Sequence, residues 1–207
     1  MQEALRTKLR LVNGFDALRS IAGVDVGYDV PRGLAHASVV IVSFPELSVL
    51  EQLQVFAPVN FPYIPGLLSF REIPAILAAL AKLCAWPDLW MVDGQGIAHP
   101  RRMGIAAHLG VLLDMPSIGV AKSRLTGQFT APGQQKGDIS PLMAGKEHIG
   151  TVLRSKEKTN PLFISPGHKV DIETAVDITR KCLTRYRLPE PTRLADKYSK
   201  VKSLTNS

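Results

Sequence analysis

The first half of the chain shows a helical pattern followed by three stretches with the two-residue period of strands. Residues 1–12 place Leu5, Leu9 and Val12 on one helical face, which predicts a short helix in an N-terminal segment of residues 1–20. Proline-containing turns separate the strand-like runs that follow, which cover residues 21–28, 36–44 and 48–57. Three sequential strands joined by short turns form an antiparallel meander.

The second half alternates helical patterns with short apolar runs. Helices are predicted over residues 69–85, 104–113 and 171–187, and strands over residues 88–92, 117–121, 149–154 and 161–165. A meander continued by helix-linked strands predicts an α/β fold, in which parallel strands extend the meander into one mixed sheet with helices on both faces. The polar residues 189–207 are expected to form a tail that frays.

Length and composition limit the class of protein. The 207 residues are enough for one domain with a core, taken here as residues 1–207, and 45% hydrophobic residues are typical of a globular chain. The N-terminus lacks the apolar core of a secretory signal, and no apolar run approaches the roughly 18 residues of a membrane span, so we expect a cytoplasmic protein. Both cysteines lie in apolar helical stretches and are expected to be buried free thiols.

The charge pattern favours a polyanionic partner. The net charge is +7, and most basic side chains follow residue 98, whereas the acidic ones are divided evenly between the two halves. A basic surface around a few unpaired carboxylates suits an enzyme that holds a phosphate chain together with a metal ion.

Three carboxylates are candidates for such a metal site. Asp25 interrupts an apolar strand between Val24 and Val26, so it points to the face that carries two glycines, which would leave room for a ligand; alternatively it faces solvent. Asp93 ends an apolar strand before a glycine, where it could equally cap a turn. Glu72 follows Ser69 by three residues, the spacing of a helix capping box. With no zinc-type ligand pair nearby, such carboxylates favour Mg²⁺ or Mn²⁺.

Basic residues near the ends of the predicted strands are candidate phosphate partners. Arg101 and Arg102 stand at a helix entry, where they contact phosphate or form a solvated turn. Lys122 and Arg124 follow the strand over residues 117–121. His168 precedes a predicted helix, and it is either a surface residue or one that orients water in a metal-phosphate site.

A rigid apolar turn projects an aromatic ring from Tyr63, Ile64, Pro65 and Gly66. Such a turn either covers the core or acts as a wedge between bases, a role for which proteins use apolar residues and proline.

Five blocks of sequence together resemble the bacterial endonuclease V family between about residues 20 and 194. The blocks read IAGVDVGYD, PYIPGLLSFRE, DGQGIAHPRRMGIAAHLGVLLDMPSIGVAKSRL, NPLFISPGH and YRLPEPTR. The resemblance implies a ribonuclease H-like fold. It also implies a DNA repair endonuclease that recognises deoxyinosine and hydrolyses the second phosphodiester bond on its 3′ side, leaving a 3′-hydroxyl and a 5′-phosphate. Members of the family need Mg²⁺ or Mn²⁺, and some also cut RNA that contains inosine.

The same resemblance assigns roles to single residues. It implies metal-binding carboxylates, a catalytic histidine, a lysine near the phosphates, a strand-separating wedge and a pocket for hypoxanthine. The metal-binding carboxylates are Asp25, Glu72 and Asp93, the catalytic histidine is His168 and the lysine is Lys122. The wedge consists of Tyr63, Ile64 and Pro65. The pocket residues are Gly66, Leu68, Gly94, Gly96, His99, Ile105 and Leu125. Gln95 departs from the family's usual DGHG, so any charged role of that histidine is lost, and the N-terminal region before Asp25 is short.

Two other functions stay open at this point. A structure-specific nuclease, such as a junction resolvase, would use the same carboxylates but leave the PYIP and DGQGIAHPRR blocks unexplained. A non-catalytic nucleic-acid binder predicts salt-dependent binding without cleavage. Nothing in the sequence requires more than a monomer.

Overall fold

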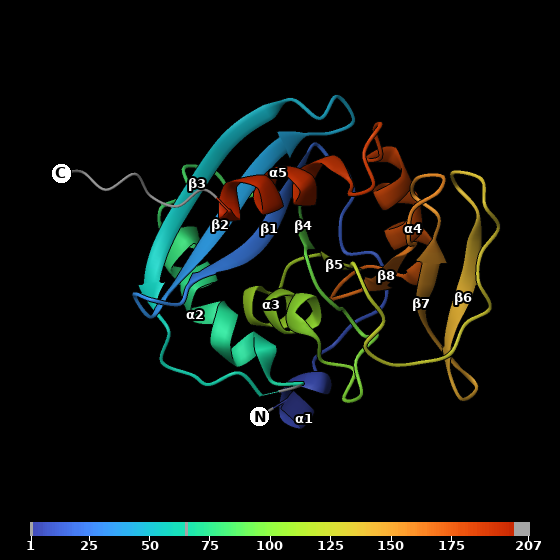
Figure 1. The fold of residues 1–207 in the computed structure, drawn as a ribbon, viewed down its shortest axis with the longest axis horizontal. Helices are drawn as coiled ribbons and strands as arrows, with labels where there is room; N and C mark the ends of the chain where they lie inside the picture. Colours follow the sequence, from blue (N-terminus) through green and yellow to red (C-terminus); the bar gives the residue numbers. More distant parts are fainter. Residues whose placement is uncertain (1, 65, 201–207) are drawn as a thin grey trace.

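The computed structural model of the chain describes residues 2–64 and 66–200. Its eight strands form one sheet in the order β3-β2-β1-β4-β5-β8-β7-β6 (Figure 1). They are β1 (Ser20–Asp29), β2 (Leu34–Ser43), β3 (Val49–Pro58), β4 (Leu89–Val92), β5 (Ser117–Ala121), β6 (Ile139–Ala144), β7 (Glu147–Leu153) and β8 (Leu162–Pro166). β1, β4 and β5 run parallel, and all other neighbouring pairs are antiparallel. The predicted ribonuclease H-like mixed sheet, with its antiparallel meander and parallel strands, is therefore confirmed.

Helices cover both faces of this sheet, as the sequence predicted. They are α1 (Gln2–Arg6), α2 (Leu68–Leu80), α3 (Ile105–Leu113), α4 (Ile172–Lys181) and α5 (Glu190–Ser199). Successive side chains of a strand point to opposite faces. On β4, Met91 therefore joins the core beneath α4 and α5, whereas Trp90 joins the core beneath α2 and α3. Apolar side chains pack between the sheet and the helices on each face, and this packing holds the strands in their positions.

The N-terminal helix is shorter than predicted, because α1 ends at Arg6. Beyond it the backbone bonds to a distant segment: Gly14 donates to the carbonyl of Lys169, and Lys169 donates to the carbonyl of Arg10. Because these backbone groups bond to Lys169 and not to each other, the helix does not continue through residues 10–14. Val12 is accordingly exposed, although Leu5 and Leu9 pack against α3 residues as a helical face would.

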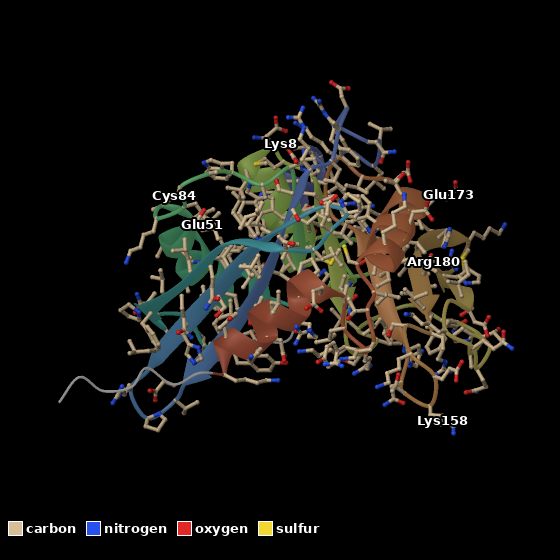
Figure 2. All side chains as sticks on the ribbon, turned by 90° about the horizontal axis from the view of Figure 1, so that it is seen from above. Lys8, Glu51, Cys84, Lys158, Glu173 and Arg180 are labelled. Carbon is tan, nitrogen blue, oxygen red and sulfur yellow. The ribbon has the colours of Figure 1, made fainter. Side chains whose placement is uncertain are left out.

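Two further helices also end early. α2 ends at Leu80, and α4 ends at Lys181, where the carbonyl of Cys182 accepts from Glu190 and the chain reverses. The prediction of a buried thiol holds for Cys182 but is wrong for Cys84, which is exposed. Its backbone N–H donates to the Glu51 carboxylate at 2.9 Å, and Figure 2 shows the two residues together at the surface.

The predicted fraying tail is wrong for residues 190–199, which form α5. Pro191 lies in its first turn, a position that favours helix initiation, and Leu194 and Ala195 are buried against the sheet. Figure 1 shows α5 lying over β1 and β2. Residues 201–207 of the predicted tail lie outside the described residues.

Strand β6 was missed because its sequence contains Pro141 and alternates weakly. It lies at the edge of the sheet, with β7 as its neighbouring strand and an isolated bridge from Met143 to Gln128 on its other side. Edge strands tolerate proline because much of one side of the backbone makes no ladder bonds. Among the described residues, no helix has the length and apolar character needed to cross a membrane.

Candidate active site

Three aspartates from three separate elements meet at the carboxyl ends of the parallel strands. Asp25 lies within β1, Asp93 directly follows β4, and Asp196 is on α5; one carboxylate oxygen of each lies within 4.8 Å of the others. Val24 and Val92 are partners in the parallel β1–β4 ladder, and the Asp93 N–H donates to the Val24 carbonyl at 2.9 Å. Strand pairing therefore brings the two predicted aspartates together, and the packing of α5 adds the third.

The glycines beside Asp25 do not leave room for a ligand, contrary to the sequence-based interpretation. A Cβ at Gly23 would overlap the backbone of Pro191, and one at Gly27 would overlap that of Ser199. Both glycines therefore allow α5 to lie directly on β1. The Ser199 hydroxyl donates to the Asp25 carboxylate, so the same close packing orients this side chain.

Glu72 lies beside this cluster and is not a helix cap. The N-cap of α2 is Leu67, which makes no side-chain capping bond, and the Ser69 hydroxyl instead contacts Nδ1 of His108 at 2.9 Å. The Glu72 carboxylate is 7% exposed and accepts a 3.1 Å hydrogen bond from the Tyr28 hydroxyl. Burial is the main cause that raises its pKa to about 8. The hydrogen bond from Tyr28 lowers this pKa, and the negative charges of Asp25 and Asp93 raise it further. The capping box is therefore wrong.

Lys122 supplies the positive charge closest to the aspartates. Its ammonium forms ion pairs with Asp93 and, at 2.5 Å, with Asp196. Burial disfavours the charged ammonium, but the two carboxylates outweigh burial and raise the pKa of Lys122 above its usual range. Burial, followed by the charge of Asp25, likewise raises the pKa of Asp93.

These carboxylates fit a divalent cation. Asp25, Asp93, Asp196 and the nearby Glu72 provide oxygen ligands only, which hard cations such as Mg²⁺ prefer. Burial is the main reason that the pKa values of Glu72 and Asp93 are raised, and the negative charge of neighbouring aspartates raises them further. A bound cation would relieve the repulsion that now favours protonation.

A cavity of about 380 Å³ opens next to the aspartates. Its walls include Asp93 and Lys122 together with six of the seven residues that the sequence resemblance assigned to a base pocket, which are Gly66, Leu68, Gly94, His99, Ile105 and Leu125. Backbone and apolar groups therefore surround most of the space, with a few polar side chains at its edge.

Gly96, the seventh predicted pocket residue, does not line this cavity. A Cβ there would overlap the carbonyl of Pro166, so the glycine permits β8 to pack against the segment that follows Asp93. The Gly96 N–H donates to the Ser165 hydroxyl at 2.8 Å. Its place is thus explained by strand packing.

Two polar side chains at the cavity are neutral. Burial and the neighbouring Arg101 lower the pKa of His99 to about 4, which leaves an uncharged imidazole at neutral pH. Gln95 is 9% exposed; its amide nitrogen donates to the Ser123 carbonyl at 2.9 Å, while its amide oxygen has no hydrogen-bond partner among the described residues.

The predicted wedge lies at the mouth of the cavity. Tyr63 is 67% exposed and Ile64 40%, and Tyr63 also lines the cavity; Pro65 lies outside the described residues. A large exposed aromatic ring beside a base-sized space is an arrangement that can insert between bases.

Two predicted phosphate contacts have partners within the chain. Arg101 donates to the Gly66 carbonyl at 2.6 Å and to the Gln2 side chain, so it braces the loop that carries the wedge. Arg102 forms a 2.7 Å ion pair with Glu147. Arg124, in contrast, is exposed at the cavity rim, where it donates to the Gly127 carbonyl and lies over the ring of Phe129.

His168 does not belong to this site. Its carbonyl accepts from the N–H of Ser117, the first residue of β5, whereas Lys122 follows the opposite end of the same strand. The imidazole is buried, accepts from the backbone of Arg10 and contacts Asp114 at 3.1 Å. The imidazole ties the N-terminal segment to the C-terminal end of α3, where Asp114 is the C-cap. Its position does not support the catalytic role implied by the resemblance.

Sequence reasoning missed Asp196, Ser199 and Tyr28. Asp196 and Ser199 lie in the segment expected to fray; the signals that could have found the helix are Pro191 in the first turn and the apolar pair Leu194 and Ala195. Tyr28 lies three residues after Asp25 in the same strand, and nothing in its sequence context predicts the hydrogen bond to Glu72.

Comparison with known proteins gives a consistent result. The model of the family described as Endonuclease V matches residues 3–197. The endonuclease V of Azotobacter vinelandii is 52% identical over 197 residues, covering 95% of this chain and 89% of the relative. The crystal structure of the endonuclease V from Streptomyces avermitilis has a TM-score of 0.90 and 42% identity, covering 96% and 88% of the two chains. That of Ciona intestinalis endonuclease V in complex with a 24mer DNA containing an inosine followed by a ribo-adenosine has a TM-score of 0.83 and 31% identity, covering 96% and 92%.

Proposed function

The chain belongs to the endonuclease V family, and we propose that it is a metal-dependent repair endonuclease that recognises deoxyinosine in DNA and hydrolyses the strand on the 3′ side of the lesion. One observation carries this proposal: Asp25, Asp93 and Asp196 converge directly beside a cavity of about 380 Å³ that Asp93 itself lines. A site for a cation and a space for a base are thereby adjacent, as required when the cleaved bond lies close to the recognised nucleotide.

The cavity suits the flipped-out hypoxanthine base. Flipping costs a few kcal/mol, and less when the base pair is already weakened. Gly66 and Gly94 bring backbone amides and carbonyls to the cavity wall, where they can read the O6 and N1–H edge. Adenine presents the opposite pattern of donors and acceptors there and would leave wall groups unpaired. His99 stays uncharged at neutral pH, so recognition relies on hydrogen bonds.

Exposed apolar groups at the mouth are proposed to separate the strands. Tyr63 and Ile64 are both accessible, and Arg101 holds the adjoining Gly66 in place through its carbonyl. A wedge works only if the loop that carries it is rigid, because a mobile loop would move aside instead of unstacking the nucleobases.

Asp25, Asp93 and Asp196 would hold Mg²⁺, or Mn²⁺ in its place. Glu72 is a further carboxylate beside these three aspartates. When bound, such an ion lowers the pKa of a coordinated water and so supplies hydroxide near neutral pH. Ser199 orients the Asp25 carboxylate, and Tyr28 holds that of Glu72. The chain thereby presents its carboxylates in fixed positions before substrate arrives.

Lys122 is proposed to stabilise the phosphate during hydrolysis. Its ammonium lies between Asp93 and Asp196, and its raised pKa keeps it charged at every working pH. A fixed positive charge is most effective where negative charge grows in the transition state. Arg124, exposed at the cavity rim, is the remaining candidate for a phosphate contact.

The finer features follow the family. We propose cleavage of the second phosphodiester bond 3′ to the lesion, with a 3′-hydroxyl and a 5′-phosphate as products, and action on inosine in RNA as a second substrate. All proposed site residues come from a single chain, which is consistent with a monomer.

The test is the cleavage of matched oligonucleotides that contain either inosine or adenosine at one position, with product mapping in Mg²⁺ and in EDTA. We expect cutting of the inosine strand alone, at one position, and only with Mg²⁺. Equal cutting of both strands, or preferred cutting of a four-way junction, would favour a structure-specific nuclease. Salt-dependent binding with no cutting in any divalent ion would indicate a binding protein.

A further inference from the structure

A second and larger hollow lies on the other side of the aspartates. Its volume is about 710 Å³, and it is lined by Lys122, Tyr186, Arg187, Leu188, Arg193, Asp196, Lys197 and Lys200. We call this surface the basic groove. We propose that it holds the nucleotides on the 3′ side of the scissile bond; this inference rests on the proposed function.

The position of the groove sets the direction of the strand. Lys122 lines both hollows, Asp93 lines the base cavity, and Asp196 lines the groove. The aspartate cluster therefore separates the two spaces. With the lesion in the base cavity and the cleaved phosphate at the cluster, a strand that continues in the 3′ direction leaves the cavity and enters the groove.

The charge of the groove fits a chain of phosphates. Five of its lining side chains are cationic and one, Asp196, is anionic. Lys197 is exposed and, among residues 2–64 and 66–200, forms no ion pair with a carboxylate. Its charge is therefore available to a ligand that carries repeated negative charges.

The part of the groove around Arg193, which lies one helical turn before Lys197 on α5, is held in place by side-chain contacts. The Arg193 guanidinium stacks on the Tyr186 ring at 4.3 Å from its centroid and forms a two-pronged ion pair with Glu190 through bonds of 2.5 and 2.8 Å. Arg187 donates to the backbone carbonyls of Lys122 and Asn160, both at 2.8 Å. These contacts fix the shape of the groove and link it to the loop that carries Lys122.

The test uses fluorescent inosine strands of three forms: full length, shortened on the 3′ side of the scissile bond, and shortened on the 5′ side of the lesion. Binding is measured in EDTA, where no cleavage occurs, for the wild type, for Lys197→Ala and for Lys82→Ala. Lys82 is the matched control, since it follows α2 on the opposite face of the sheet and is exposed.

We expect shortening on the 3′ side to weaken wild-type binding by about tenfold, and Lys197→Ala to weaken binding of the full strand by about threefold. Lys197→Ala should lower the slope of log K against log salt by about 0.7 to 0.9 for the full strand and leave it unchanged for the 3′-shortened strand. Shortening on the 5′ side should affect all three proteins equally, and Lys82→Ala should match the wild type.

The proposal is overturned if Lys197→Ala weakens binding of the 3′-shortened strand as much as that of the full strand, or if its effect disappears only on the 5′-shortened strand. Cleavage of the full strand by the wild type in Mg²⁺ is measured in parallel. Absence of that cleavage would overturn the proposed function itself, and with it the direction assigned here, whereas normal cleavage with an unaltered salt slope would overturn the groove alone.

Discussion

Replacing Glu72 by glutamine should stabilise the metal-free protein at alkaline pH and leave its stability at pH 5 nearly unchanged. Glu72 is 7% exposed, and burial together with the charges of Asp25 and Asp93 raises its pKa from 4.5 to about 8. The folded chain thus holds this proton more tightly than the unfolded chain does. The resulting stability is fully present below pH 4.5 and is lost as the pH rises through about 8. Glutamine has no proton to lose and keeps the size of the side chain.

The magnitude follows from the two pKa values. At about 1.4 kcal/mol per pH unit, the rise from 4.5 to about 8 gives roughly 4 to 5 kcal/mol, an upper bound because the structure can relax around the ionised group. Denaturant unfolding in EDTA at pH 5, 7 and 8.5 measures this difference for the wild type and for Glu72→Gln. Glu46→Gln, at an exposed carboxylate, is the control. Parallel profiles of the wild type and Glu72→Gln would contradict a raised pKa at Glu72, and with it the burial of this carboxylate.

Four other variants test separate parts of the structure. Asp196→Asn should lower the rate of inosine-strand cleavage at least about a hundredfold, whereas His168→Asn should keep the rate and lose stability; the reverse result in a cleavage assay would restore the histidine to the site. Tyr63→Ala should weaken binding to an inosine duplex while Mg²⁺ affinity, measured by calorimetry, stays the same; equal binding of inosine and control duplexes by both proteins would exclude a wedge. Gly96→Ala should cost about 2 kcal/mol or more in unfolding free energy, since its Cβ would overlap a carbonyl, and an unchanged denaturation midpoint would contradict the strand packing.

Most of the sheet and two of the three aspartates were predictable, because their signals are local. Alternating apolar residues fix β1 to β3, and a short apolar run ending at Asp93 fixes β4. Parallel pairing of β1 with β4 then brings Asp25 and Asp93 together without further information. The resemblance to a known family added most of the base cavity, which is built from loops whose shape no periodicity reveals.

What sequence reasoning missed depends on packing between distant segments. The polar character of residues 190–199 suggested a frayed tail, yet that character arises because one face of α5 carries Asp196 and Ser199 to the site. The glycines beside Asp25 were interpreted as space for a ligand, whereas they admit this helix. Neither the motif around His168 nor its position before a helix states near which end of β5 this residue lies.

The central claim is that aspartates distant in sequence hold a cation at the phosphate to be cleaved, and cleavage of an inosine strand in Mg²⁺ by Asp25→Ala and Asp93→Ala tests it most directly. We predict that the wild type cuts in Mg²⁺ and not in EDTA, and that both variants fold, as circular dichroism would verify, yet lose cleavage by about a hundredfold or more. A folded variant that cuts the inosine strand at nearly the wild-type rate would contradict the account.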